Sequence, residues 1–178
     1  MNVLPQVRNF IESRDHRIMR RVHSWIPPHW VRLWMTLATR CGDGWLWVAL
    51  ALLILAVGGE NRFLAVESST AAAATGTVFF IWAKRVTGRR RPCDIAPHSW
   101  STLLPPDQFS FPSGHTITAF AIITPLLALY PEHAFALSFC ALSIASSRII
   151  LGMHFLSDVI AGASIGTILG IISLSLLR

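Results

Sequence analysis

Five stretches of the chain consist almost entirely of apolar residues, and short polar segments separate them. They run approximately over residues 42–58, 63–83, 116–130, 134–150 and 155–177. A helix needs about 20 residues to cross a hydrocarbon core of roughly 30 Å, or fewer when its ends are well anchored. The third and fourth stretches are short enough to be core helices of a soluble protein. Five such runs in 178 residues, however, leave too little polar sequence to coat them, so the pattern predicts an all-α, polytopic membrane bundle in a single domain, 1–178.

The first 40 residues follow a different pattern, in which arginines alternate with tryptophans and aliphatic residues and no uninterrupted apolar run exists. This composition suits helices that lie in the headgroup layer of a membrane, with Pro27-Pro28 as the break between two of them. We therefore expect interfacial amphipathic helices within residues 1–40, and no cleavable signal peptide. The alternative is a first transmembrane helix that starts near Trp30 and includes Arg32 and Arg40, although an arginine inside a membrane segment costs about 2.5 kcal/mol or more. That helix would raise five crossings to six.

Composition supports a membrane protein, because 53% of the residues are hydrophobic and only 13% are charged. This balance excludes an ordinary soluble domain. The expected partners are the lipid bilayer and a membrane lipid; no nucleic acid is expected, and the oligomeric state stays open. Cys41, Cys93 and Cys140 are odd in number and widely spaced, which matches neither a disulfide framework nor a metal site. Cys41 and Cys93 could still pair in an oxidising compartment.

The last apolar stretch contains a glycine at every fourth position, at Gly162, Gly166 and Gly170. On a helix this spacing forms one flat stripe, which lets a neighbouring helix approach closely. We expect this stripe to pack inside the bundle; the alternative is a contact between two copies of the chain.

Polar residues gather in three short clusters at the ends of the apolar stretches. The clusters are Lys84 with Arg91-Pro92, then Pro112-Ser113-Gly114-His115, then Ser147-Arg148 with His154 and Asp158. Ionisable groups at membrane segments are costly to maintain and are functional candidates by default. Between the second and third clusters the chain crosses the membrane and returns, so all three clusters are expected on one side.

The cations of these clusters are suited to hold a phosphoryl group. Lys84 offers a point charge, whereas Arg91 and Arg148 offer planar guanidinium groups that can each bind two oxygens. Ser113 and Gly114 precede an apolar helix, and a hydroxyl with free backbone N–H groups at a helix N-terminus forms an anion site. The alternative is that the basic run from Lys84 to Arg91 binds lipid headgroups and that the Ser-Gly pair only caps a helix.

Two histidines and one aspartate have the spacing expected for nucleophilic attack and proton transfer. His154 and Asp158 are four residues apart, so on a helix they share one face. The carboxylate can then accept the proton of one ring nitrogen and leave the other nitrogen as a nucleophile. His115 is free to protonate the departing oxygen. A histidine and an aspartate one turn apart also form purely structural hydrogen bonds, but three clusters that agree in residue type, spacing and side favour a phosphate site.

These clusters resemble the three-part signature of the type 2 phosphatidate phosphatase superfamily, also called lipid phosphate phosphatases. Residues 84–92, 112–115 and 147–158 match that signature without a departure. The resemblance implies a membrane phosphatase that uses no metal and no other cofactor. It also implies that His154 attacks phosphorus to form a phosphohistidine that water hydrolyses, that Asp158 orients His154, and that His115 is the acid. The residues that would hold the phosphate are Lys84, Arg91, Ser113, Gly114 and Arg148.

A lipid is the expected substrate, because the clusters lie where helices leave the membrane. The stretch 85–112 contains prolines and aromatic residues, and we expect it to form an active-site loop near the acyl chains. Polyprenyl diphosphates such as undecaprenyl diphosphate, phosphatidylglycerophosphate, phosphatidate and lipid A all present the same charged group. The alternatives to hydrolysis are lipid-to-lipid phosphotransfer at the same site and a non-enzymatic transporter or lipid-binding protein. The related vanadate-dependent haloperoxidases are soluble, and this chain lacks the polar surface for that.

Charge alone does not decide which side of the membrane the site faces. If five helices cross, the positive-inside rule places the N-terminal arginines and the site cations together in the cytoplasm. The resemblance instead implies an extracytoplasmic site in the inner membrane of a bacterial cell. A further crossing between Trp25 and Arg40 would reconcile the two, and we expect the extracytoplasmic orientation.

Overall fold

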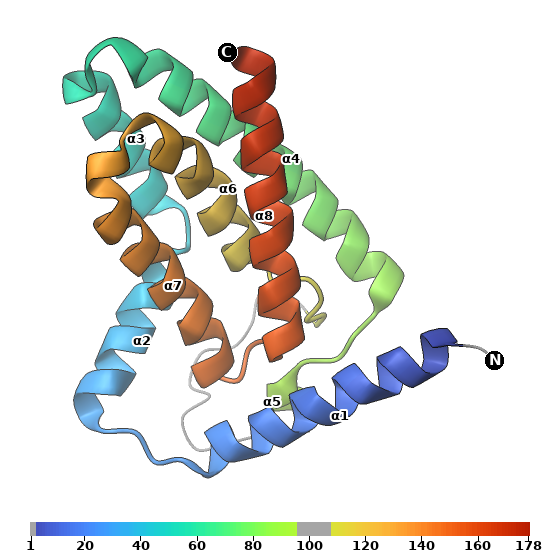
Figure 1. Cartoon of the computed structure of the whole chain (residues 1–178). Coiled ribbons are helices and arrows are strands. Elements are labelled where there is room, and N and C mark those ends of the chain that lie inside the picture. Colours follow the sequence, from blue (N-terminus) through green and yellow to red (C-terminus); the bar gives the residue numbers. More distant parts are fainter. Residues whose placement is uncertain (1–2, 96–107) are drawn as a thin grey trace.

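The computed structural model describes residues 3–95 and 108–178. The secondary-structure elements in these two ranges are α-helices and short 3₁₀ helices (Figure 1). The α-helices are α1 (Val3–Ser24), α2 (His29–Cys41), α3 (Trp45–Val57), α4 (Arg62–Thr87), α5 (Pro92–Ile95), α6 (Gly114–Leu129), α7 (Ala134–Ile150) and α8 (Leu156–Leu177). Short 3₁₀ helices, η1 (Gly59–Asn61) and η2 (Pro131–His133), join α3 to α4 and α6 to α7. The all-α prediction is confirmed, while the middle of the predicted loop 85–112 lies outside the described residues.

α6 is the central helix of the bundle and packs against α4, α7 and α8 (Figure 1). Its residues Ile117, Ala119 and Ala121 are completely buried. Because this helix is surrounded by its neighbours, its apolar residues pack on protein around most of its circumference.

The glycine stripe of α8 faces α6. A Cβ atom built at Gly162 would lie 2.9 Å from the carbonyl oxygen of Ser113, and one built at Gly170 would lie 2.7 Å from Cβ of Thr124. Larger side chains would push the two helices apart. The expected packing of the stripe inside the bundle is confirmed, and it brings the start of α6 against the start of α8.

Apolar side chains cover the outer surface of the bundle. Val48 and Leu52 of α3 and Ile168 of α8 are more than half exposed. Such a surface is unusual in water and is expected in hydrocarbon. The segments that are long and apolar enough to cross a membrane are Gly59–Thr87, Pro131–Ile150 and Leu156–Leu177, and α2 with α3 would form a fourth that is bent by 64°. α6 is shorter, with 16 residues. The structure thus confirms a membrane helical bundle, whereas five or six crossings stay a prediction.

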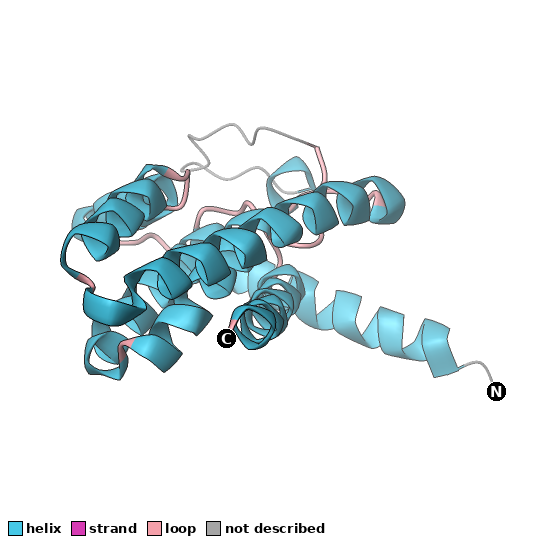
Figure 2. Cartoon of the chain, turned by 90° about the horizontal axis from the view of Figure 1, so that it is seen from above, coloured by secondary structure: helices cyan, strands magenta, loops and turns pink. Residues whose placement is uncertain are grey.

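The N-terminal residues form two helices that take different places. They are separated at residues 25–28, where Pro27-Pro28 predicted a break. α1 runs across the end of the bundle at which α8 begins and projects beyond it (Figures 1 and 2); its residues Phe10 and Ile11 are exposed, which suits the predicted interfacial helix. α2 instead packs against α7 and continues into α3 through an elbow formed by residues 42–44. This position favours the alternative in which a helix near Trp30 enters the membrane.

Candidate active site

The first polar cluster lies where α4 ends. Gly88 adopts a left-handed conformation, with φ of 56°, and donates its N–H to the carbonyl of Lys84, which terminates the helix. Lys84 therefore lies in the last turn of α4, where it is 9% exposed and its Nζ is 5.3 Å from the centre of the Phe80 ring. The chain then turns toward α5 and places Arg91 just before it, 1% exposed.

The third cluster is held together by the turn between α7 and α8. The carbonyl of Arg148, in the last turn of α7, accepts the backbone N–H groups of Met153 and His154 at 3.0 and 2.9 Å. Gly152 has φ of 68°, which permits so tight a reversal. The expectation that His154 and Asp158 share a helical face is wrong in one respect, because His154 precedes the helix and only Asp158 lies in the first turn of α8.

Both ring nitrogens of His154 have defined partners. Nδ1 lies 2.6 Å from the carbonyl oxygen of Ser110; because a carbonyl only accepts, Nδ1 bears the proton and donates it. Nε2 lies 3.3 Å from Nη1 of Arg91, which is a donor, so Nε2 presents its lone pair. Arg91 also donates to the carbonyl of Met153 at 2.8 Å. Nε2 is therefore the unprotonated ring nitrogen, and a guanidinium stands beside it.

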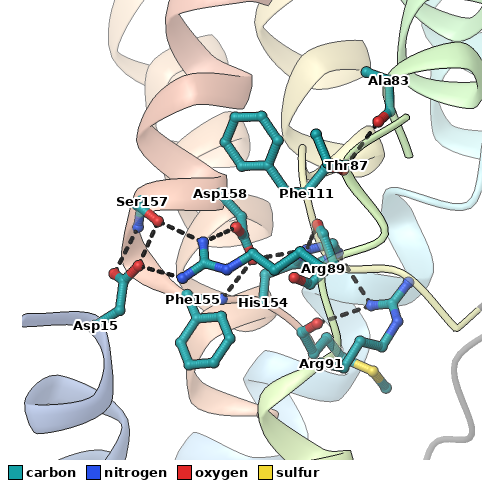
Figure 3. A network of polar contacts seen from close by, with 12 residues as sticks. Asp15, Ala83, Thr87, Arg89, Arg91, Phe111, His154, Phe155, Ser157 and Asp158 are labelled. Atoms are coloured by element: carbon teal, nitrogen blue, oxygen red, sulfur yellow. Dashed lines mark hydrogen bonds and ion pairs between the residues drawn. The ribbon is translucent and has the colours of Figure 1, made fainter. Parts of the chain in front are cut away.

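Asp158 lies next to the His154 ring without a hydrogen bond to it. Its Oδ2 is 3.6 Å from Nδ1 of His154 and accepts the N–H of Phe155 at 2.9 Å. Its Oδ1 accepts from Nη1 of Arg89 at 2.5 Å (Figure 3). The sequence predicted that Asp158 would accept the ring proton, whereas the structure assigns that place to Ser110. Asp158 instead contributes a negative charge beside the ring.

The second cluster forms the start of α6. Ser113 is the N-cap residue, and its carbonyl accepts the first hydrogen bond of the helix, so the N–H groups of the first turn have no partner within the helix. The N–H of Ser113 itself donates to the carbonyl of Asp158 at 3.2 Å. A Cβ atom built at Gly114 would lie 3.3 Å from the ring of Phe80, so glycine lets this helix end approach the last turns of α4.

His115 is paired with a residue from the N-terminal part of the chain. Its Nε2 donates to Oδ1 of Asp43 at 2.9 Å. Asp43 lies in the elbow between α2 and α3, and a Cβ atom built at the neighbouring Gly42 would lie 2.7 Å from Cδ2 of His115. The elbow can therefore approach the ring only because it contains glycine. Because Nε2 donates to Asp43, the proton of a neutral His115 ring lies on Nε2 and Nδ1 is unprotonated.

Arg148 is also held by the N-terminal part, because its Nη1 donates to the hydroxyl of Thr39 on α2. The charges of Arg148 and Lys84 act on the rings of both His115 and His154, so the two histidines border one group of cations. Burial, followed by the charges of Arg148, Arg91 and Lys84, lowers the pKa of His154 well below its usual value. The ring is therefore neutral at neutral pH.

The structure brings all eight predicted site residues to one end of the bundle, and it adds residues that sequence reasoning missed. These are Asp15, Thr39, Asp43, Arg89 and Ser110. Arg89 was part of the basic run that could bind lipid headgroups, but its side chain is directed at Asp158 (Figure 3). Glycines on both sides of Asp43 marked a turn, yet nothing connected it with His115. Within residues 3–95 and 108–178, no group of three or more His, Cys, Asp or Glu side chains could hold a metal ion.

Known proteins share sequence with this chain. The sequence model of the PAP2 superfamily matches residues 62–178. The lipid A 1-phosphatase of Rhizobium etli is 34% identical over 87 residues, which are 47% of this chain and 38% of that protein. The phosphatidylglycerophosphatase B of Bacillus subtilis is 34% identical over 130 residues, which are 66% of this chain and 53% of that protein. The chain thus spans between 38% and 53% of the length of these two relatives.

Solved structures share the fold as well. The crystal structure of Aquifex aeolicus LpxE has a TM-score of 0.73 and 30% identity, and the match covers 89% of this chain and 93% of that chain. The first transmembrane PAP2 type phosphatidylglycerolphosphate phosphatase from Bacillus subtilis has a TM-score of 0.72 over 94% of this chain and 86% of that chain; at 22% identity it supports the fold alone. The superfamily match begins where α4 begins, so α1, α2, the elbow and α3 lie outside it.

Proposed function

The chain belongs to the PAP2 superfamily, and from this membership we propose that it is a multi-pass membrane phosphatase that hydrolyses a phosphate monoester or diphosphate on a lipid. The observation that supports this most directly is the environment of His154, a buried imidazole whose Nδ1 donates to Ser110 and whose Nε2 lies beside Arg91. Lys84 and Arg148 add two more buried cations. A phosphoryl group bound among these cations would place its phosphorus in front of Nε2.

In the first step of the proposed reaction, Nε2 of His154 attacks phosphorus and the bond to the leaving oxygen breaks. His115 gives that oxygen its proton, and Asp43 stabilises the charged form of His115 from which the proton comes. The phosphorylated ring of His154 is positively charged, and the carboxylate of Asp158, 3.6 Å from Nδ1, balances this charge. The cations offset the negative charge of the phosphoryl oxygens.

In the second step, water attacks the phosphohistidine and His115 accepts a proton from that water. Inorganic phosphate leaves, and His154 returns to its neutral form with the proton still on Nδ1. The N–H groups in the first turn of α6, which begins at Gly114, would hold phosphate oxygens in both steps, with the hydroxyl of Ser113 beside them.

An apolar cleft supports a lipid as the leaving group. The cleft lies between α3, α4 and α6, has a volume of about 270 Å³, and is lined by side chains such as Trp47, Ile54 and Ile122. It begins at Gly44, directly after Asp43, and therefore on the side of the site where His115 lies. Since His115 would face the leaving oxygen, the hydrocarbon attached to that oxygen would enter this cleft. A water-soluble phosphate ester would leave the cleft unused.

The substrate is best identified with a panel of lipids. The relatives are a lipid A 1-phosphatase and a phosphatidylglycerophosphatase, so we propose lipid A phosphate and phosphatidylglycerophosphate as the first candidates, followed by phosphatidate and polyprenyl diphosphate. Purified protein in vesicles is incubated with each lipid, and both free phosphate and new phosphorylated lipids are measured. Release of free phosphate supports hydrolysis, transfer to a second lipid supports the phosphotransferase alternative, and no reaction with any lipid rules out the proposal.

We further propose that the protein lies in the inner membrane of a bacterial cell with its site on the extracytoplasmic side. The resemblance of the signature to bacterial lipid phosphatases supports this side. A cysteine introduced at Ser101, in a variant whose own cysteines are replaced by serine, tests it with a membrane-impermeant thiol reagent. Labelling of intact cells is the expected result, and labelling only after permeabilisation would place the site in the cytoplasm.

A further inference from the structure

α1 contacts the site through one buried acid. Asp15 is 3% exposed, although most polar residues around it on α1 are exposed. Its Oδ1 accepts the backbone N–H of Ser157 at 3.1 Å, and its Oδ2 accepts the hydroxyl of Ser157 at 2.5 Å. Ser157 lies in the first turn of α8, where backbone N–H groups have no partner within the helix. A side chain of α1 therefore caps the helix that begins beside His154.

Arg89 connects this acid to the carboxylate in the site. Its Nη2 donates to Oδ2 of Asp15 at 2.7 Å, and its Nη1 donates to Oδ1 of Asp158 at 2.5 Å and to the hydroxyl of Ser157 at 2.7 Å (Figure 3). The guanidinium carbon also lies 4.3 Å from the centre of the Phe155 ring. A planar guanidinium can bind two carboxylates at once, which lysine cannot do with the same geometry. The side chain of Arg89 is thus fixed on several sides.

These contacts determine how the carboxylate of Asp158 is oriented. Arg89 binds Oδ1 and the N–H of Phe155 binds Oδ2, so Oδ2 is the oxygen that remains near Nδ1 of His154, at 3.6 Å. Asp158 is completely buried, and a buried carboxylate that loses a charged partner is strongly destabilised. Without Arg89 it would turn toward other donors, and its negative charge would move relative to the ring.

Resting on the function proposed above, we propose that α1 is a positioning element of the site: Asp15 fixes Arg89, and Arg89 fixes Asp158 beside His154. Asp15 and Arg89 contact each other, Ser157, Asp158 and the Phe155 ring, and none of these groups binds the phosphate in the proposed reaction. Asp15 and Arg89 act on the step in which the ring of His154 becomes positively charged. Replacing either residue is therefore expected to lower kcat and to leave KM unchanged.

The test compares Asp15→Asn and Arg89→Gln with two control variants, Arg17→Gln and Arg90→Gln. Arg17 is exposed on α1 and Arg90 is the exposed neighbour of Arg89. The full chain in vesicles is assayed with the lipid phosphate that the wild type hydrolyses. We expect Asp15→Asn and Arg89→Gln to lower kcat by about 10- to 100-fold, with KM within about twofold, because a small displacement of a charge is enough for such a loss. The controls should match the wild type.

Two further variants separate positioning from a general loss of stability. Arg89→Lys keeps the charge without the planar geometry and should recover part of kcat. The double variant Asp15→Asn/Arg89→Gln should lose no more than Arg89→Gln alone, because Asp15 acts through Arg89. Thermal unfolding checks that each variant folds; if Arg89→Gln does not fold, Asp15→Asn decides, since asparagine has the same size.

The possible failures are distinguishable. Full kcat in Asp15→Asn and Arg89→Gln, losses that multiply in the double variant, or a loss confined to KM overturns the inference and leaves the phosphatase proposal intact. A wild type that releases phosphate from no lipid of the panel overturns both, because Asp158 then has no reaction to be positioned for.

Discussion

Residues 62–178 contain all the groups that the proposed reaction needs, whereas residues 3–61 contain side chains that hold two of those groups directly and a third through Arg89. Asp43 binds His115, Thr39 binds Arg148, and Asp15 binds Arg89 next to Asp158. Only the first of these regions matches the superfamily. The reacting groups and their supports are thus separated along the chain, and variants in the two regions should fail in different ways: loss of chemistry in the first, and loss of precision in the second.

The largest effect is expected from His154→Ala, which removes the proposed nucleophile. Because no other described side chain can take the place of Nε2 beside Arg91, phosphate release should fall by about 10³-fold or more. The measurement is phosphate release by purified protein, together with an acid-labile, base-stable phosphate label on the wild type during turnover. His133→Ala is the control, because His133 is exposed and pairs with Glu132 at the other end of the bundle. A His154→Ala variant that keeps most of its activity would remove this residue from the mechanism.

The pH dependence of kcat/KM tests the state of the same ring. The lowered pKa of His154 keeps the imidazole neutral at and above pH 6.5, so the acid limb due to this group should lie below pH 6.5 and fall about tenfold per pH unit. Arg91→Gln removes a charge that lowers this pKa, and the limb should therefore move to higher pH. A limb that does not move would show that Arg91 has no electrostatic effect on the nucleophile.

A smaller effect is expected from Asp43→Asn, in the supporting region. Asparagine keeps the shape of the side chain but not the charge that stabilises protonated His115, so kcat should fall by about 10- to 100-fold. Gly42→Ala should act in the same direction, because the added Cβ would lie 2.7 Å from the His115 ring. Asp94→Asn is the control, since Asp94 is exposed just after Arg91 and Pro92. Equal kcat values for Asp43→Asn and the control would make the elbow a structural feature only.

The smallest effect is expected from Thr39→Val, which removes the hydroxyl that accepts from Arg148 without changing the size of the side chain. Arg148 would still be present but less well oriented toward phosphate oxygens, so KM should rise by about threefold to tenfold. Thr36→Val, one turn earlier on α2, is the control. A change in kcat with KM unaffected would mean that Arg148 acts on the transition state alone.

The sequence predicted that the candidate site residues lie together on one side, but it did not predict the residues that contact them. Lys84, Arg91, His115 and Arg148 stand in short segments at the ends of apolar stretches, where both position and residue type were visible. The acceptor for the His154 proton was predicted from spacing on a helix, and the prediction was wrong, because the turn before α8 directs Nδ1 to the carbonyl of Ser110. No side-chain pattern can reveal a backbone carbonyl as a partner.

The apolar stretches determined the class of fold, since side chains that water rejects over such lengths must lie in hydrocarbon or in the bundle core. The glycine stripe likewise determined where two helices could meet closely, because a Cβ atom at these positions would collide with the neighbouring helix. Only the packed structure decided that Asp15, Thr39 and Asp43 reach the site, because hydrogen bonds join atoms that are close in space, and helix packing brings together residues as far apart as 142 positions. These distances in space cannot be read from the order of residues along the chain.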